Sequence, residues 1–221
     1  MTWTQYTGRV TVGGPAQTHE LEALMISKVA VGPMDNNAYV LRCRATGEQL
    51  LIDAANEPRT LLTLVGNDGL ASVVTTHQHQ DHWQALADVV AATGARTLAG
   101  RYDAEGIAVP TDVLVDDGDP VRVGRVELTA RHLSGHTPGS IALVYDDPHG
   151  HPHVFTGDCL FPGGVGNTWG DAERFVSLLD DVETKLFDRL SDETWVYPGH
   201  GNDTTLGTER PHLKEWRERG W

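Results

Sequence analysis

The chain has 221 residues, enough to bury the core of one domain, and its composition of 39% hydrophobic and 22% charged residues is typical of a folded globular protein. A formal net charge of −14 argues against a nucleic-acid partner, because binding phosphate backbones draws on clustered Lys and Arg. The first residues form neither a basic segment nor an apolar leader, no stretch approaches a membrane span, and two cysteines are too few for a disulfide framework, so we expect a cytoplasmic protein.

The first half of the chain combines short apolar runs with two helical patterns. Apolar runs bounded by turn-forming residues predict strands at residues 24–31, 38–43, 49–52 and 72–75. Between the last two, Pro58 suits a first helical position and Gly66 a helix stop, which predicts a short helix. A second helix is expected directly after the fourth strand, since apolar residues recur at helical spacing from Trp83 to Val90, before Gly94.

The second half of the chain also combines predicted strands with a predicted helix. Strands are predicted at residues 126–133, 141–145, 153–156 and 194–197. A helix is predicted from an N-cap at Asp171, with an apolar stripe made of Phe175, Leu178, Leu179, Val182 and Leu186. Strands and helices are interspersed and no linker divides them, so we expect one α/β domain over residues 1–221.

The segment TTHQHQDHW is the strongest chemical signal in the sequence. It places His77, His79, Asp81 and His82 within six residues, between a predicted strand and a predicted helix. In an extended loop, side chains two residues apart project to the same side, so His77 and His79 can reach one metal ion while Asp81 and His82 turn toward a second. The spacing predicts two metal sites.

Three further candidate ligands, His136, Asp158 and His200, follow later predicted strands. Loops that leave the carboxyl ends of strands converge at one sheet edge, so these side chains are expected to join the first four. A glycine precedes each of the three, and a residue without a Cβ lets the backbone turn sharply and approach a metal closely.

Five imidazoles and two carboxylates suit two divalent ions. This set favours Zn²⁺ and also tolerates Fe or Mn. The two carboxylates, Asp81 and Asp158, are the residues that we expect to act in catalysis. A structural zinc site is disfavoured, because such sites are usually closed and rich in cysteine.

These motifs resemble a known family. TTHQHQDH, HTPGS after Gly135, TGDCLF around Asp158 and PGHG around His200 are together similar to the metallo-β-lactamase superfamily, particularly its glyoxalase II-like branch, from about Val31 to Gly201. The resemblance implies a four-layer αββα sandwich. It also implies that Asp158 bridges two metal ions.

In that arrangement one ion is held by His77, His79 and His136, and the other by Asp81, His82 and His200. Asp53, in LIDAA, matches a family aspartate that orients ligands, and His132 lies near enough in sequence to support His136. The chain departs from the branch at Asn167, which stands where an arginine is common. We assign Asn167 to substrate binding, although this departure puts recognition of a glutathione-type anion in doubt.

The expected activity is hydrolysis of a small-molecule thioester or related ester by a hydroxide that bridges two metal ions. A thiolate leaves readily, because thiol pKa values lie near 8.5. Two alternatives remain open: a persulfide dioxygenase with one Fe(II) held by two His and one Asp, and a lactonase. The sequence does not indicate the oligomeric state.

Several other residues have simpler interpretations. His149, His151 and His153, in HGHPH, are expected in an exposed loop, and Cys159 in the core. The basic C-terminal segment 208–221 is predicted to be a packed terminal helix, with closure over the active site or dimerisation as alternatives.

Overall fold

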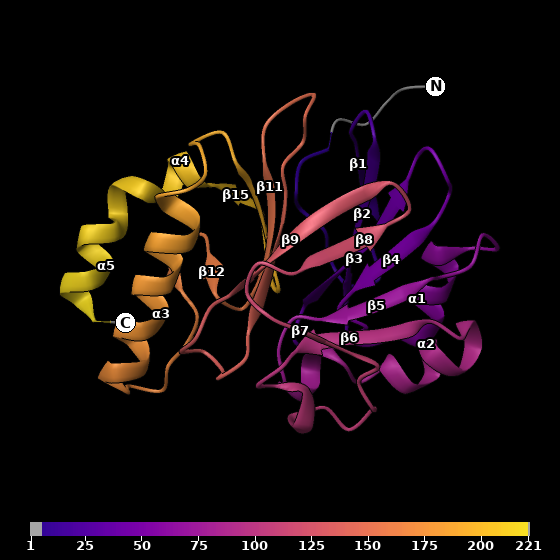
Figure 1. Cartoon of the computed structure of the whole chain (residues 1–221), viewed down its shortest axis with the longest axis horizontal. Coiled ribbons are helices and arrows are strands. Elements are labelled where there is room, and N and C mark those ends of the chain that lie inside the picture. The colour runs from indigo at the N-terminus through magenta and orange to yellow at the C-terminus, as the bar shows by residue number, and fades with distance from the viewer. Residues whose placement is uncertain (1–5, 221) are drawn as a thin grey trace.

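The computed structural model describes residues 6–220, in which two β-sheets pack face to face and helices cover both outer faces (Figure 1). The strands and helices, in chain order, are β1 (Gln17–Glu20), β2 (Leu24–Val31), β3 (Asn36–Cys43), β4 (Gln49–Ile52), α1 (Pro58–Val65), β5 (Ser72–Thr75), α2 (Leu86–Thr93), β6 (Arg96–Gly100), β7 (Val113–Val115), β8 (Pro120–Val123), β9 (Val126–His132), β10 (Ile141–Tyr145), β11 (His153–Gly157), β12 (Leu160–Phe161), β13 (Gly164–Val165), α3 (Ala172–Val182), β14 (Trp195–Pro198), β15 (Thr204–Thr205), α4 (Leu206–Glu209) and α5 (Leu213–Arg219).

The first sheet has the order β1-β2-β3-β4-β5-β6-β7. Strands β1 to β4 are antiparallel, whereas β4 to β7 are parallel, and α1 and α2 connect the parallel strands β4, β5 and β6. These helices bury Leu61, Val65 and Val89 against Leu51 and Val73 of the sheet. Each helix therefore covers the outer face, at the right of Figure 1.

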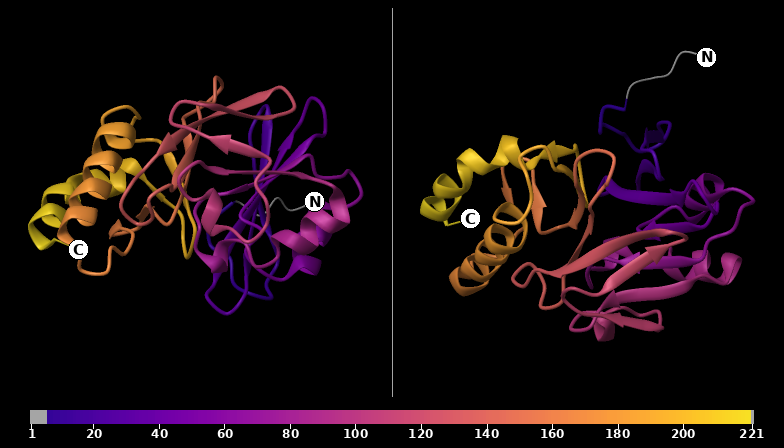
Figure 2. Two further views of the ribbon diagram at one scale, coloured as in Figure 1. Left: turned by 60° about the horizontal axis from the view of Figure 1, so that its bottom comes forward. Right: turned by 45° about the horizontal axis from the view of Figure 1, so that its top comes forward.

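The second sheet has the order β15-β14-β11-β10-β9-β8. Its outer face is covered by α3 and α5, which lie at the opposite side of the molecule in both views of Figure 2. Phe175, Leu178 and Leu179 of α3 pack with Trp216 of α5 and with Val196 of β14. Between the sheets lies a separate core, to which β9 contributes every second residue, as expected for a strand with one face toward the core.

The four-layer αββα sandwich expected from the resemblance is confirmed, and all eight predicted strands are present to within two residues. Seven other strands were not predicted: β1, β6, β7, β8, β12, β13 and β15. The second helix starts later than expected, since a turn of 3₁₀ helix, Gln80–His82, follows β5 and α2 begins only at Leu86. Asp171 caps α3 as predicted, accepting from the N–H groups of Glu173 and Arg174.

The prediction for the HGHPH segment is wrong in part. His149 is exposed, but His153 is the first residue of β11 and only 1% exposed, because this strand lies between β10 and β14 and buries both faces. The C-terminal segment forms the expected packed helix: Trp216 is buried, and Arg217 pairs with Asp180 and Glu183. Trp221 lies outside the described residues.

None of the helices within residues 6–220 combines the length and the apolar character needed to cross a lipid bilayer. Cys159 is fully buried, as expected.

Candidate metal centre

The segment that carries the first four predicted ligands starts where β5 ends. The backbone N–H and the hydroxyl of Thr76 both donate to the carboxylate of Asp53, at 2.8 and 2.9 Å. Asp53 follows β4 directly and is 2% exposed. The 3₁₀ turn Gln80–His82 then folds the segment back, so that its ligand side chains lie in one cluster.

The seven predicted ligands converge from four loops. They form three groups, in each of which the ligand atoms lie within 4.8 Å of one another: His77, His79 and His136; His77, His82 and Asp158; and Asp81, His82 and His200. His77 and His82 each belong to two groups, so the groups form one continuous cluster. Asp158 faces both ends of it, with Oδ1 3.4 Å from His82 Nε2 and Oδ2 3.7 Å from His136 Nε2.

Three ring nitrogens meet at one end of the cluster. His79 Nδ1 lies 2.9 Å from His77 Nε2 and 2.9 Å from His136 Nε2. A tetrahedral zinc ion about 2.0–2.1 Å from each nitrogen would hold them roughly 3.3 Å apart. The three imidazoles therefore fit a single ion after a small outward adjustment.

The other ring nitrogens are oriented by the protein. In four of the histidines, the Nδ1 atom lies within hydrogen-bond distance of an oxygen. The partner is Thr76 Oγ1 for His77 at 3.1 Å, Asp53 Oδ2 for His82 at 2.8 Å, the Asn167 carbonyl for His136 at 2.9 Å and the Met34 carbonyl for His200 at 2.9 Å. With the proton on Nδ1, the lone pair of Nε2 points into the cluster. This is the usual support for a metal-binding histidine.

Two atoms at the centre of the cluster have no hydrogen-bond partner. Within residues 6–220, His82 Nε2 and Asp158 Oδ1 are buried and unpaired, and they face each other at 3.4 Å. A buried polar atom left without a partner costs free energy. A bound cation would satisfy both atoms, so the residues present fit the metal ions that the motif predicts.

Protons occupy part of this cluster when no ion does. Burial raises the pKa of Asp158, but the His82 and His200 imidazoles outweigh it and hold that pKa well below its usual range. Burial lowers the pKa of both imidazoles, yet nearby carboxylates raise it well above normal for His82 and to about 10 for His200. Burial instead lowers the pKa of His77 far below normal and that of His136 to about 4. The His77 end thus offers neutral imidazoles, and at the other end an ion would replace protons.

Sequence reasoning missed two side chains that hold the cluster in place. Asp103, fully buried beyond β6, accepts from Gln78 N at 3.0 Å and from Gly139 N at 2.7 Å, and so ties together the loops that carry His79 and His136. Asn36 donates to Asp81 Oδ2 at 2.8 Å. An aspartate just after a strand was the available signal for Asp103, but the unpredicted β6 concealed it.

The loop that carries His200 is held by buried polar contacts with β2 and β3. Lys28, fully buried, lies 2.6 Å from Asp203 Oδ1 and donates to the Gly201 carbonyl at 2.8 Å. The amide of Asn37 donates to the carbonyls of Pro198 and Gly201, both at 2.9 Å. The chain on both sides of His200 is therefore bound to β2 and β3.

The structure corrects the predicted role of His132. Its Nε2 contacts the Pro138 carbonyl at 2.7 Å, and the Nδ1 of His136 pairs instead with Asn167. His132 is still part of β9, paired with Ile141, and the loop between them carries His136 away from the strand.

Asn167, the residue assigned to substrate binding, makes hydrogen bonds to neighbouring residues with both its side chain and its backbone carbonyl. Its Oδ1 accepts from Trp169 N at 2.7 Å, and its carbonyl accepts from His136. Its polar side chain therefore shapes the loop beside His136.

Comparison with known proteins agrees with this geometry. Residues 31–200 match the model of the metallo-beta-lactamase superfamily. A hydroxyacylglutathione hydrolase from Polaromonas sp. is 38% identical over 167 residues, or 75% of this chain, and the match spans 62% of that protein's length. The solved structure of ETHE1 from Myxococcus xanthus is 30% identical with a TM-score of 0.75, over 87% of this chain and 84% of that chain.

The structure of TTHA1623 in a di-iron-bound form is 32% identical with a TM-score of 0.67, over 83% of this chain and 96% of that chain. The family match covers more than half of the chain and includes all seven predicted ligands, and the fold is the expected one. The chain belongs to the metallo-beta-lactamase superfamily and resembles its glyoxalase II-like branch.

Proposed function

We propose that this chain is a metal-dependent hydrolase that cleaves a small-molecule thioester, or a related ester, at a dinuclear centre. The observation that carries the proposal is the convergence of seven ligand side chains around two buried atoms, His82 Nε2 and Asp158 Oδ1, that lack partners. Two divalent ions bound there would lower the pKa of a water molecule toward neutrality and polarise a carbonyl oxygen. Zinc suits the ligands best, with iron or manganese as alternatives.

The carboxylates have distinct tasks in this proposal. Asp158 lies between the two ends of the cluster, so its two oxygens would bind one ion each. The Asn36 amide holds the carboxylate of Asp81, whose Oδ2 lies 3.4 Å from both His82 Nε2 and His200 Nε2. Asp81 would therefore bind only the ion at the His82 and His200 end of the cluster. Two carboxylates offset only half of the four positive charges of two divalent ions, so the centre keeps a positive surplus that favours a developing oxyanion.

The residues around the centre favour a thiolate as the leaving group. A pocket of about 530 Å³ opens beside His79 and His136, and its other lining residues are Gln78, Thr137, Pro138, Trp169 and Arg174. Apart from the two imidazoles, this set contains no side chain that titrates near neutral pH. A thiolate, with a pKa near 8.5, departs without a strong general acid, and this favours a thioester over an amide.

The test combines metal analysis with turnover. We expect the purified chain to contain close to two metal ions and to hydrolyse at least one member of a thioester and lactone panel. Asp158→Ala should lose most metal and turnover together, whereas Asp116→Ala, a change at an exposed carboxylate paired with Arg101, should lose neither. An Asp158→Ala protein that is free of metal and fully active would refute the proposal.

A second candidate is supported by one of the three ligand groups. His77, His82 and Asp158 make a set of two histidines and one carboxylate, the type that holds a single Fe(II) with open positions. A persulfide dioxygenase would use such a centre. One iron per chain together with oxygen consumption on a persulfide would favour this candidate, and two metal ions without oxygen uptake would favour hydrolysis.

A further inference from the structure

Two kinds of residue line the pocket beside the metal centre. The His79 and His136 imidazoles belong to the predicted ligands, and Trp169 and Arg174 come from the loop before α3 and its first turn. Neither of the latter two residues belongs to the ligand cluster. The proposed function gives them no task.

Trp169 is held in an unfavourable position. Its side chain is 56% exposed, and its backbone has a φ of 55°, the left-handed region that bulky residues rarely adopt. Its ring stacks on His136 with centroids 5.3 Å apart and meets the edge of His79 at 5.4 Å. A strained backbone that presents a large apolar ring to solvent beside two metal ligands is more typical of a binding surface than of a packing residue.

Arg174 also lines this pocket, and its side chain is held in place. Its Nε donates to the Gly135 carbonyl at 2.8 Å, its Nη2 donates to the His136 carbonyl, and its guanidinium lies 4.7 Å from the centroid of the Trp169 ring. These contacts use two of the five N–H donors of a guanidinium. Within residues 6–220 it forms no ion pair, although the chain has 31 acidic against 17 basic residues. Arg174 is therefore a cation held in place, with three N–H donors left for a substrate.

We propose that Arg174 and Trp169 are the specificity-determining residues of this site, and that they select substrates with a carboxylate close to the scissile carbonyl. The inference rests on the proposed function. A guanidinium offers parallel N–H donors that match the two oxygens of a carboxylate. The indole covers the apolar part of the substrate, between the carboxylate and the reacting carbonyl at the His79 and His136 end.

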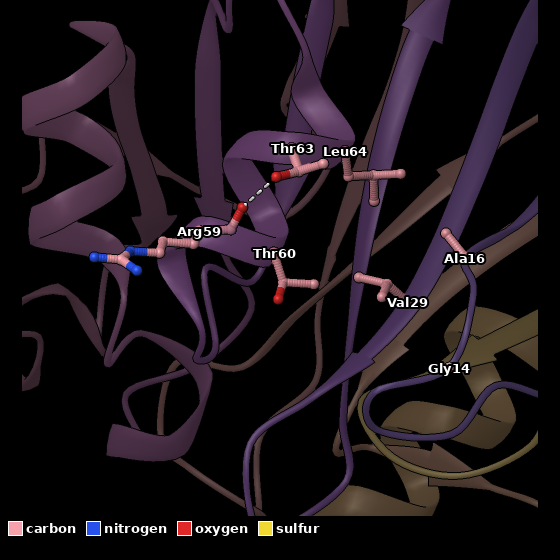
Figure 3. A pocket seen from close by; sticks show the side chains of 7 residues that line it. All are labelled: Gly14, Ala16, Val29, Arg59, Thr60, Thr63 and Leu64. Carbon is pink, nitrogen blue, oxygen red and sulfur yellow. Dashed lines mark hydrogen bonds between the residues drawn. The ribbon is translucent and has the colours of Figure 1, made fainter.

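A second hollow in the molecule lacks this combination. It has about 450 Å³ and is lined by residues of α1, β2 and the segment before β1, with none of the seven ligands among them. Figure 3 shows the Arg59 side chain extending away from the other lining residues, Thr60, Thr63, Leu64 and Val29 among them. Arg59 therefore provides a matched control, an arginine beside a pocket that none of the seven predicted ligands lines.

The first experiment measures binding without chemistry. Calorimetry on the full chain compares two non-hydrolysable thioethers that differ only in a carboxylate and its carboxamide. We expect the carboxylate to bind roughly 10- to 100-fold more tightly, as charge-assisted hydrogen bonds predict. In Arg174→Gln this preference should fall to near one, Arg174→Lys should restore part of it, and Arg59→Gln should leave it unchanged. Trp169→Ala should weaken both ligands.

The ratio of the two affinities distinguishes loss of carboxylate recognition from general damage to the protein. A disturbed fold or a lost metal ion would weaken both thioethers, whereas loss of the Arg174 contact weakens the carboxylate alone. The two ligands are made in two series, with the carboxylate on the acyl side or on the thiol side, and the series that shows the preference identifies its position. Equal affinities in the unsubstituted protein, or an unchanged preference in Arg174→Gln, would overturn the inference.

The matching thioesters separate this inference from the proposed function. If carboxylate and carboxamide thioesters are hydrolysed with equal kcat/KM, the hydrolase stands and the selection by Arg174 is wrong. If neither is hydrolysed while the thioether preference still depends on Arg174, the recognition site stands and the hydrolase is wrong.

Discussion

Acidification should destabilise the fold through His153, a residue outside the metal centre. His153 is 1% exposed in β11, and its Nδ1 lies 3.0 Å from the hydroxyl of Tyr197. Burial, followed by the neighbouring imidazoles of His151 and His19, lowers its pKa to about 3. In the unfolded chain the pKa of a histidine is about 6.5, so the unfolded state takes up a proton first as the pH falls.

The sign and size of the effect follow from this difference in pKa. Above pH 6.5 His153 is neutral in both states and contributes no pH dependence. Between pH 6.5 and 3 only the unfolded state is protonated at this position, and the free energy of unfolding falls steadily. For pKa values of 6.5 and about 3, the loss between pH 7.5 and pH 5 is about 2 kcal/mol, or roughly 4–8 °C in Tm for a chain of this size.

Urea unfolding at pH 7.5 and pH 5 measures this loss directly. His153→Phe keeps an aromatic ring at this position, beside Tyr145 and Tyr197, but cannot bind a proton. The variant should lose about 2 kcal/mol less between the two pH values than the unsubstituted chain. His212→Phe, at an exposed histidine beside Glu215, should behave like the unsubstituted chain. The same pH dependence in His153→Phe as in the unsubstituted chain would show that His153 is not the source.

Two further predictions concern the contacts around the metal centre. Asp103→Ala should weaken metal binding by roughly 10- to 100-fold, because it releases both Gln78 and Gly139, and competition with a chromophoric chelator measures the change. A change of less than twofold would contradict this. Lys28→Met should lower the free energy of unfolding by about 3–5 kcal/mol in urea, because the buried Asp203 carboxylate keeps the hydrogen bonds from Tyr6 and Trp195 but loses its cation. Adding Asp203→Asn should recover part of that loss, and no recovery would contradict the explanation.

The cluster of His and Asp side chains could be predicted from the sequence because its signal is local. His77, His79, Asp81 and His82 lie within six consecutive positions, and the loop after β5 needs only a short turn to bring them together. Later ligands follow strand ends, and strands meet at sheet edges. The four-layer fold came from the family resemblance, since apolar runs show where strands are but not how they pair.

The unpredicted elements have weak local signals. Strand β6, with the sequence RTLAG, contains residues of low β propensity and is a strand because β5 and β7 pair with it on both sides. His153 was expected to be exposed because it follows Gly150 and Pro152, although it also begins the strand predicted at residues 153–156, and burial in the sheet overrides that turn signal. In both cases long-range pairing decides the structure.

The glycines show why ligand positions are easier to predict than the residues that select substrates. A Cβ on Gly199 would lie 2.2 Å from Asp158 Oδ1, so this glycine does permit a close approach at the metal centre. A Cβ on Gly135 would instead lie 2.4 Å from the Arg174 carbonyl and 2.5 Å from Leu178 Cβ, so this glycine lets α3 pack against the loop that carries His136. That packing places Arg174 within reach of the Gly135 and His136 carbonyls. Metal ligands follow from residue type and spacing, whereas a selecting arginine depends on a helix that a glycine elsewhere in the chain allows to approach.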